Sequence, residues 1–527
     1  MTLETIDIVI IIGYAAALLA IALFVSREPA GHQKDTQDYF LAGRALPWWA
    51  IGASLIASNI SAEQIIGQSG QGFAVGMAIA AYEWQAAIVL IIVAKYFLPI
   101  FLKRRIYTMP QFLEQRYGTR VKNLMSVFWV ALYTAVNLTT VLWLGGLAVQ
   151  SLTGWGVMGS MAALAAFAAL YSLYGGLKAV ALTDIIQVVI LVIGGLAITW
   201  FALDALPADG ALGGLGFLWA EMPGHFEMIL APDHPAYGDL PGIWTLLGGL
   251  WVLHFSYWGF NQYIIQRALG AQSLGEAQKG LAFAAFLKIL VPFIVVIPGI
   301  AAVILAQQGV LDGAALAAKS DRTYGELMAF APAGLRGLVF AALIAAVVSS
   351  LASMMNSIST IFTMDLYRPL RPERPEAHYV MIGRISAFVA MALALVLARP
   401  FLGGFESAFQ TVQEYTGFIA PGVVVVFVLG FLDKRANAAG AFTALLGSLA
   451  LNVIVAQIAQ DLPFVVRIWI VFLVALVAAI AVSRATAAPR EDGPVKLSDI
   501  GFGTSALFNT MAVITVAVLV GLYAVLW

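Results

Sequence analysis

Residues 59–72 read NISAEQIIGQSGQG, and they interrupt an apolar run that extends from about residue 46 to residue 74. The stretch combines amide, hydroxyl and carboxylate side chains with Gly67, Gly70 and Gly72. Polar groups and glycines at the centre of a membrane helix are typical of a discontinuous helix, whose unwound backbone lines a binding site. Glycine is also frequent in continuous membrane helices, where it permits close packing. The stretch therefore predicts a broken helix, with close packing as the alternative.

The composition of the whole chain is that of a membrane protein. Of its 527 residues, 61 % are hydrophobic and 11 % are charged, against about 45–50 % and about 25 % in soluble domains. The net charge of −1 gives no basic surface, so we expect no nucleic-acid partner. The chain has no cysteine and its five histidines lack ligand spacing, so transition-metal chemistry is not expected.

The apolar runs predict an all-α polytopic membrane protein with about fourteen transmembrane helices. The first run, residues 6–25, follows an acidic segment and is too long for the core of a signal peptide, so we expect a retained helix. The other thirteen are expected at about residues 46–74, 76–102, 123–151, 156–176, 179–205, 242–266, 280–306, 334–364, 379–400, 405–432, 437–458, 464–485 and 504–526.

The distribution of cationic residues predicts the orientation of the chain. Arg27, Lys34 and Arg44 follow the first helix, which places this link inside and the N-terminus outside. The later inside loops then hold most of the Lys and Arg residues, Arg267 among them, whereas the loop 204–242 holds six acidic residues and no Lys or Arg. We therefore expect a multi-pass protein of the cell (inner) membrane with both termini extracytoplasmic.

The predicted helices fall into two groups of five whose starts lie about 195 residues apart. Because five is odd, the groups insert with opposite orientation, which is the pattern of an inverted repeat. A second, weaker break is expected in HFSYWGFNQ, around Gly259. The predicted division is 1–45 as N-terminal helix and link, 46–205 and 242–432 as the repeats, 206–241 as an external acidic loop, and 433–527 as three further helices.

Several polar side chains lie in apolar stretches, where an unpaired charge costs a few kcal/mol or more. Glu83 and Lys288 are the strongest functional candidates, with a structural ion pair or snorkelling as the alternative. Asp184 lies nearer the cytoplasmic end, and function and structure are equally favoured there. For Gln64, Gln413 and Glu414, interhelical hydrogen bonding is the favoured interpretation. For His254, the favoured interpretation is a buried structural histidine.

The run AAVVSSLASMMNS places Ala346, Ser349 and Ser350 on one helix face. Tight packing is the usual reason for such small residues. The hydroxyls, together with carbonyls released by a broken helix, would also suit a bare Na⁺ ion. The chain has neither a G-x-x-x-x-G-K-[ST] phosphate loop nor H-E-x-x-H, so we expect energy to come from an ion gradient.

Six stretches resemble the sodium:solute symporter family, in its sodium/glucose cotransporter group. They are DYFLAGRALPWWAIGASLIASNISAEQIIGQSG, YEWQAAIVLIIVAKYFLPIF, YGGLKAVALTDIIQ, YWGFNQYIIQR, VVSSLASMMNSISTIFTMDLY and FQTVQEYTGFIAPG, and the likeness covers nearly the whole chain. The resemblance implies a leucine-transporter-like core of two inverted five-helix repeats. It implies symport of Na⁺ with a sugar, galactose or glucose, by alternating access.

The resemblance also assigns site residues. The implied Na⁺ ligands are the carbonyls of Ala57, Ile60 and Ala346 and the hydroxyls of Ser349 and Ser350, with Asp184 on the path of Na⁺ to the cytoplasm. The implied sugar contacts are Gln64, Glu83, Lys288 and Gln413, together with His254. The implied gates are Tyr257 on the inner side and Gln68, Tyr82 and Phe409 on the outer side.

Three residues depart from the galactose-transporting members of the group. Ala86 replaces a serine, His254 an asparagine and Gln68 a methionine, so the identity of the sugar stays open. Members with a second sodium site carry a hydroxyl where this chain has Ala352, which predicts one Na⁺ per sugar although Ser353 and Asp184 remain.

Other functions stay open beside sugar symport. The first is a same-family symporter for inositol, a nucleoside, sialic acid or an amino acid, and the second is a transporter-like sensor or a sodium channel. No catalytic constellation indicates an enzyme. Na⁺ is the expected coupling ion, no organic cofactor is expected, the lipid bilayer is the surrounding partner, and the oligomeric state stays open.

Overall fold

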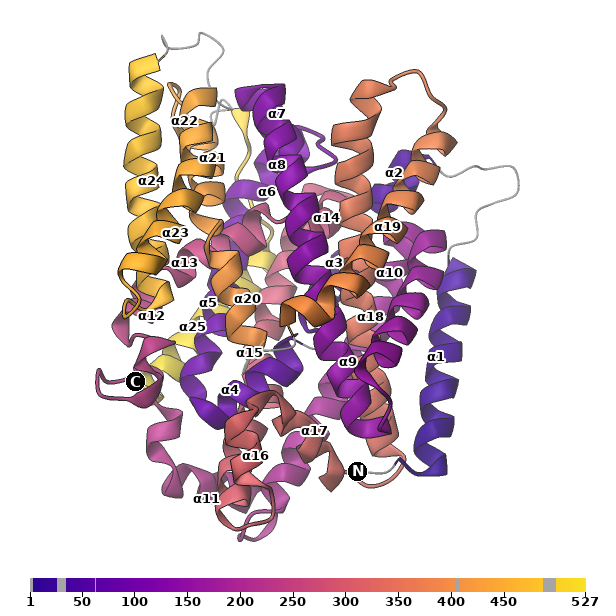
Figure 1. Cartoon of the computed structure of the whole chain (residues 1–527), viewed down its shortest axis with the longest axis vertical. Coiled ribbons are helices and arrows are strands. Elements are labelled where there is room, and N and C mark those ends of the chain that lie inside the picture. The colour runs from indigo at the N-terminus through magenta and orange to yellow at the C-terminus, as the bar shows by residue number, and fades with distance from the viewer. Residues whose placement is uncertain (1–2, 26–34, 62, 403–407, 487–498) are drawn as a thin grey trace.

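The computed structural model describes residues 3–25, 35–61, 63–402, 408–486 and 499–527, and helices dominate these ranges (Figure 1). Within them, the only backbone pairing of strand type is an isolated parallel bridge between Leu46 and Ala271. Arg27, Lys34, Arg490 and Lys496, which contribute to the predicted orientation, lie outside the described residues.

The α-helices are α1 (Thr5–Val25), α2 (Thr36–Leu41), α3 (Trp48–Asn59), α4 (Gln68–Ala74), α5 (Ala81–Ile92), α6 (Leu98–Lys103), α7 (Met109–Tyr117), α8 (Thr119–Leu132), α9 (Thr139–Thr153), α10 (Val157–Asp204), α11 (Gly210–Glu221), α12 (Ile243–Leu247), α13 (Leu250–His254), α14 (Gln262–Leu269), α15 (Leu274–Gln307), α16 (Gly313–Ala318), α17 (Thr323–Leu327), α18 (Leu335–Ile361), α19 (Glu376–Leu402), α20 (Ala408–Gly417), α21 (Ala420–Leu432), α22 (Ala438–Phe442), α23 (Ser448–Ile458), α24 (Phe464–Thr486) and α25 (Ala506–Val525). Wider π-helical turns lie at Glu63–Gly67, Val93–Phe97, Tyr133–Leu138, Phe255–Gly259, Phe362–Tyr367 and Thr443–Gly447.

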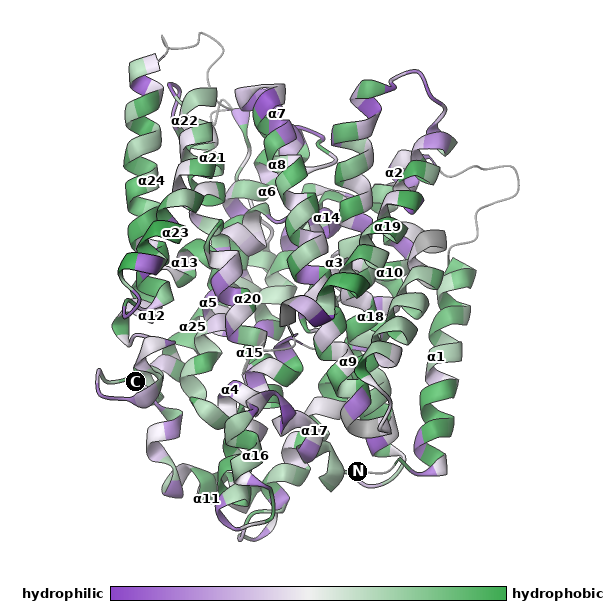
Figure 2. Cartoon of the chain, in the orientation of Figure 1, coloured by the Kyte–Doolittle hydropathy of each residue, from purple (hydrophilic) through white to green (hydrophobic). Residues whose placement is uncertain are grey.

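Among the described residues, ten helical segments are long and apolar enough to cross a membrane, and the bent pair α20 and α21 brings the number to eleven. The other three predicted spans are a short helix at 157–170 and the two segments 48–74 and 243–269, whose helices are interrupted. A criterion of continuous length misses interrupted spans, so the number fourteen stays a prediction. Figure 2 shows the long helices α1 and α24 as largely hydrophobic.

The first predicted break is confirmed, and it precedes the glycines. Helix α3 ends at Asn59, Ile60 has φ −74° and ψ 81°, and the chain becomes helical again from Glu63. Gly70 and Gly72 instead allow close packing, because a Cβ on either would lie 2.6 Å from a backbone oxygen of another segment. Both interpretations of the stretch are therefore correct, at different residues.

The second predicted break is also present, just after Gly259. Phe260 has φ −125° and ψ −5°, and Asn261 is extended. The side chain of Asn261 then accepts a hydrogen bond from the Tyr263 amide at 3.2 Å and so caps α14.

A third interruption divides α10 at Gly176, which has φ +63° and ψ −161°. A Cβ at this position would lie 2.6 Å from the carbonyl oxygen of Tyr39, so both the backbone conformation and the space require glycine. The interruption falls between the predicted spans 156–176 and 179–205.

Both ends of the described chain lie on the same face of the bundle as the loop 206–241. The Met228 amide donates to the Leu526 carbonyl at 2.7 Å, and α1 begins at the lower end of the bundle, where α11 also lies (Figure 1). Termini on one face require an even number of crossings, as fourteen would give. The division into two repeats stays a prediction.

Candidate solute and cation sites

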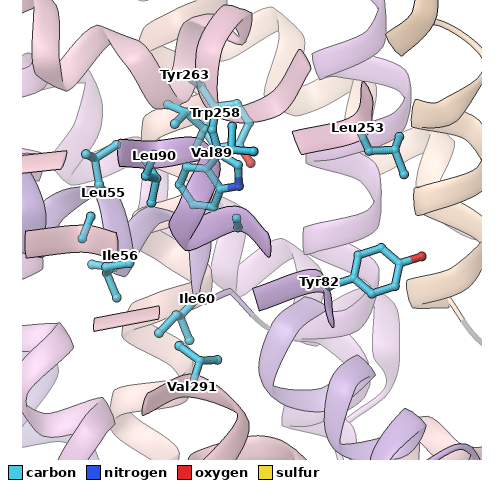
Figure 3. Packing of buried hydrophobic residues seen from close by; sticks show 14 of the residues in the cluster. Leu55, Ile56, Ile60, Tyr82, Val89, Leu90, Leu253, Trp258, Tyr263 and Val291 are labelled. Atoms are coloured by element: carbon cyan, nitrogen blue, oxygen red, sulfur yellow. The ribbon is translucent and has the colours of Figure 1, made fainter. Parts of the chain in front are cut away.

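One cavity lies where the two broken helices meet α5, α15 and α20. Its volume is about 50 Å³, and it is lined by Asn59, Glu63, Gln64, Gln68, Tyr82, Glu83, Leu253, His254, Tyr257, Trp258, Lys288, Gln413 and Thr416. The structure thus brings together all five expected solute contacts and three of the four expected gate residues. Packed hydrophobic residues surround this region, among them Ile56 and Ile60 of the first broken helix and Trp258 of the second (Figure 3).

The cavity wall contains a buried ion pair. Lys288 on α15 pairs with Glu83 on α5, and each residue is 1 % exposed. The Lys288 ammonium also donates to Asn59 Oδ1 and lies 4.8 Å from the centre of the Trp258 ring. Gln68 Nε2 donates to the other oxygen of Glu83 at 2.7 Å. Glu83 and Lys288 therefore do form an ion pair, as the structural alternative expects, and both residues also line the cavity.

Tyr257, the expected inner gate residue, is hydrogen-bonded on one side of the cavity. The hydroxyl of Tyr257 accepts a hydrogen bond from Asn59 Nδ2 at 3.1 Å and shares another with the hydroxyl of Tyr263. Tyr257 lies just before the second break and Asn59 just before the first. This contact therefore joins the two broken helices directly.

Two of the expected outer gate residues, Tyr82 and Phe409, pack against each other. Tyr82 and Phe409 meet edge to face with ring centres 5.4 Å apart, and Tyr82 has a similar contact with His254 at 6.4 Å. Phe409 does not line the cavity, but it lies so close to Gly67 that a Cβ there would be 2.6 Å from Phe409 Cβ. Phe409 therefore packs against Tyr82 and Gly67 without lining the cavity.

Three buried polar atoms at the cavity residues have no hydrogen-bond partner among the described residues. They are Gln68 Oε1, the Tyr82 hydroxyl and His254 Nε2. Buried polar atoms are normally paired, so each of these favours a polar partner that is not part of the chain. For His254, the interpretation as a hydrogen-bonded structural histidine does not account for Nε2.

The resemblance did not assign four polar or aromatic residues of the wall: Asn59, Glu63, Trp258 and Thr416. Asn59 and Glu63 belong to the polar stretch that predicts the first break, and Trp258 to the second. Their nearness to the breaks was a signal in the sequence, but their orientation toward the cavity was not.

The expected cation ligands belong to two segments, α18 and the end of α3. The Ser61 amide donates to the Asn59 carbonyl at 2.8 Å, so the α-helical hydrogen bond from Ser61 to the Ala57 carbonyl is not made. The hydroxyl of Ser350 donates to the Ser58 carbonyl at 2.9 Å, which brings α18 against this break. Hydroxyl and carbonyl oxygens are the ligands that hard cations take.

Asp184 belongs to this region as well. Its carboxylate accepts hydrogen bonds from Ser349 and, at 2.6 Å, from Ser54. Because Ser349 donates its proton to Asp184, the lone pairs of its oxygen stay available to a cation.

Arg267 differs from its predicted place in an inside loop. Its side chain is 1 % exposed, and its guanidinium lies 3.6 Å from Asp184. It donates to Ser54 Oγ and to the Tyr263 carbonyl, both at 2.6 Å, and also to Ser58 and Ser353. Arg267 therefore does not count as a loop charge, because it lies on the short helix α14 and points into the bundle, where Asp184 compensates its charge.

Comparison with known proteins identifies the family and the fold of this chain. The sequence profile of the sodium:solute symporter family matches residues 39–447. The chain belongs to the sodium:solute symporter family. The expected leucine-transporter-like fold agrees with two solved structures. A Na⁺-coupled sialic acid symporter has a TM-score of 0.79 at 21 % identity, over 93 % of this chain and 99 % of that one. MhsT in complex with L-phenylalanine has a TM-score of 0.51 at 13 % identity, over 84 % and 99 %.

Relatives within the family carry names of sugar and polyol transporters. The chain is 47 % identical to a sodium/glucose cotransporter of Vibrio parahaemolyticus, over 100 % of this chain and 99 % of the relative. It is 33 % identical to sodium/glucose cotransporter 4 of Mus musculus, over 86 % and 69 %. It is 32 % identical to sodium/myo-inositol cotransporter 2 of Sus scrofa, over 86 % and 70 %.

Proposed function

We propose that this protein is a secondary active symporter that couples Na⁺ entry to the uptake of a sugar. The observation that carries the proposal is the cavity between the two broken helices, with its neutral ion pair and its unpaired hydrogen-bonding atoms. The full-length similarity to a protein named sodium/glucose cotransporter supports the same substrate class.

The polar groups of this cavity suit a neutral polyhydroxylated solute, and the cavity volume of about 50 Å³ has to increase before a hexose enters, since small-molecule pockets measure about 300–1,000 Å³. The amides of Gln64 and Gln413, the Glu83 carboxylate and the imidazole of His254 can donate to or accept from sugar hydroxyls. The ammonium of Lys288 already pairs with Glu83. A solute with a carboxylate, such as an amino acid or sialic acid, would have to break this pair to gain a cationic partner. The cavity therefore favours a sugar over the acidic solutes.

In the proposed mechanism, Na⁺ binds to the carbonyls of Ala57, Ile60 and Ala346 and the hydroxyls of Ser349 and Ser350. The ion holds the first broken helix against α18, so Asn59 and Gln64 are ordered at the sugar cavity. Coupling requires only that Na⁺ binds the sugar-competent state better than the alternative state. The two sides of the cavity then open in turn. Tyr257 moves to open the inner side, and Tyr82 and Phe409 move to open the outer side.

A specific observation keeps inositol as the second candidate solute. His254 lines the cavity where an amide is expected, whereas Ala86 is fully buried on α5 and is not part of the cavity wall. The imidazole of His254 alters the partners of individual hydroxyls, which is the strongest way to discriminate between polyols. The similarity to a sodium/myo-inositol cotransporter points to the same alternative.

Uptake into proteoliposomes tests the proposal. Labelled galactose and glucose are supplied with an inward Na⁺ gradient, K⁺ is the control, and unlabelled inositol, sialic acid and proline are competitors. We expect Na⁺-dependent accumulation of a hexose, with inositol a stronger competitor than sialic acid or proline. Absence of hexose accumulation, with Na⁺-driven uptake of a competitor in its place, would contradict the sugar assignment. A sensor or a channel would show no accumulation of any solute.

We also propose that the chain lies in the cell (inner) membrane with both termini on the extracytoplasmic side. The shared face of the two termini and the acidic loop 206–241 supports this orientation. Epitope tags at either end should be accessible to antibody in intact cells or spheroplasts.

A further inference from the structure

Helix α20 carries two residues of the proposed transport machinery, and it meets α21 at a bend. The two helices are inclined by 45° across a short break after Gly417. Phe409 packs against Tyr82 at the proposed outer gate, and Gln413 lies in the cavity wall. The inclination of α20 therefore decides whether these two side chains reach Tyr82 and the solute.

The bend is held by helices that follow the two predicted repeats. Asn452 on α23 is fully buried, and its Nδ2 donates to the carbonyls of Gly417 and Phe418, both at 3.2 Å. These carbonyls belong to the end of α20, where the α-helical acceptors lose their partners. Ile468 on α24 lies so close that a Cβ at Gly417 would be 2.4 Å from its Cδ1.

Arg467 on α24 contacts both sides of the same bend. Its Nη2 lies 2.5 Å from Glu414 Oε1, on the α20 side, and its guanidinium lies 5.1 Å from the centre of the Phe418 ring. The Arg467 side chain is only 6 % exposed, whereas that of Glu414 is 46 % exposed. Glu414 is the residue next to Gln413, so the ion pair acts directly on the segment that faces the solute.

A second carboxylate interacts electrostatically with Glu414. Asp239, from the external loop 206–241, has its pKa raised by burial and by the negative charge of Glu414. Arg467 thus offsets a repulsion between the external loop and α20.

We propose that Arg467 is a positioning residue that fixes the pivot of α20 and so sets the outer gate. Helices α23 and α24 serve as the support against which this segment moves. The part of the inference that concerns sugar affinity rests on the proposed function, whereas the part that concerns gate position does not.

Cysteine labelling tests the gate position, because the chain has no cysteine of its own. Thr416→Cys places one thiol in the cavity wall, and a membrane-impermeant maleimide added outside reports how often the outer side is open. We expect Arg467→Gln to increase the labelling rate about threefold or more, because it shifts the gate equilibrium. The charge exchange Glu414→Arg with Arg467→Glu should restore a low rate.

Two further variants keep the test decisive. Arg322→Gln removes an exposed ion pair with Glu326 that does not involve α20, and it should leave the rate unchanged. Glu414→Gln breaks the Arg467 pair from its exposed side, so it tests the contact even where Arg467→Gln lowers the yield of folded protein. It should raise the rate less than Arg467→Gln does, because it also removes the repulsion with Asp239.

Transport kinetics separate positioning from general damage. Arg467→Gln should raise the KM for sugar, through Gln413, without raising the Na⁺ concentration for half-maximal activation, because the cation ligands lie on α3 and α18 and a larger outward-open population does not weaken Na⁺ binding. Unchanged labelling in both Arg467→Gln and Glu414→Gln would overturn the inference. If no sugar is transported but labelling rises as expected, the result supports the role of Arg467 at the bend and contradicts the proposed function.

Discussion

Single residues explain why the cavity is polar and why the Lys288 ammonium carries no uncompensated charge there. Glu83 and Lys288 come from different helices and compensate each other's charge, and the amide of Gln68 holds the second carboxylate oxygen. The pair is stable only while both partners are present, since one buried charge left alone costs about 3–5 kcal/mol. This gives a prediction that separates folding from transport.

Lys288→Ala should abolish sugar uptake and also lower the melting temperature, because Glu83 remains as an unpaired buried carboxylate. The double variant Glu83→Gln with Lys288→Met should regain most of the stability, since no charge is left buried, yet still transport no sugar. Thermal unfolding of the purified proteins and proteoliposome uptake measure the two effects. Wild-type uptake in Lys288→Ala would remove this residue from the solute site.

Ser350→Ala should weaken the Na⁺ dependence of transport. It removes a proposed hydroxyl ligand and the hydrogen bond to the Ser58 carbonyl. We expect the Na⁺ concentration for half-maximal uptake to rise about tenfold, which corresponds to about 1.4 kcal/mol. Ser357→Ala on the same helix is the control, because Ser357 bonds Gln266 away from the cation ligands. Equal Na⁺ curves for Ser350→Ala and wild type would contradict the assignment.

At the scale of elements, interruptions rather than continuous helices build the site. Each broken helix frees backbone groups and brings a polar residue, Asn59 or Tyr257, to the same cavity. The sequence identified both regions, but glycine marked the breaks only approximately. At Gly176 alone is a glycine itself the break, because its φ of +63° and the carbonyl of Tyr39 exclude a side chain.

Gly176→Ala should therefore destabilise the protein by about 1–3 kcal/mol, through backbone strain and contact with Tyr39. Gly159→Ala is the matched control, because it lies in the same helix α10 with nothing within 4 Å of the new Cβ. Alanine there should be neutral or slightly stabilising. Melting temperatures in one detergent compare the two. Equal melting temperatures for both variants would show that the backbone at 176 adapts to alanine.

At the scale of the whole molecule, the arrangement predicts the coupling ratio. Ala352 offers no hydroxyl to a second cation, and Asp184 is already paired with Arg267. We expect one charge to enter with each sugar. Simultaneous measurement of current and labelled sugar flux tests this, and a ratio near two would contradict it.

The sequence by itself determined the membrane character, the positions of the apolar segments and the polar residue types inside them. Hydropathy is a local property, and charges in a membrane are rare enough to stand out. The family resemblance extended this to the solute and gate residues, of which all except Phe409 line the cavity. Glu83 and Lys288 are 205 residues apart in the chain, and their residue types suggested an ion pair only as an alternative.

Only the tertiary structure decided which polar groups converge and which pair with one another. It turned Arg267 from a predicted loop into the core beside Asp184, and it placed Glu63 and Trp258 in the cavity wall. It also showed that Arg467, from a helix beyond the repeats, holds the bend of α20. Such contacts depend on how helices far apart in sequence pack together, and local residue patterns carry no information about that packing.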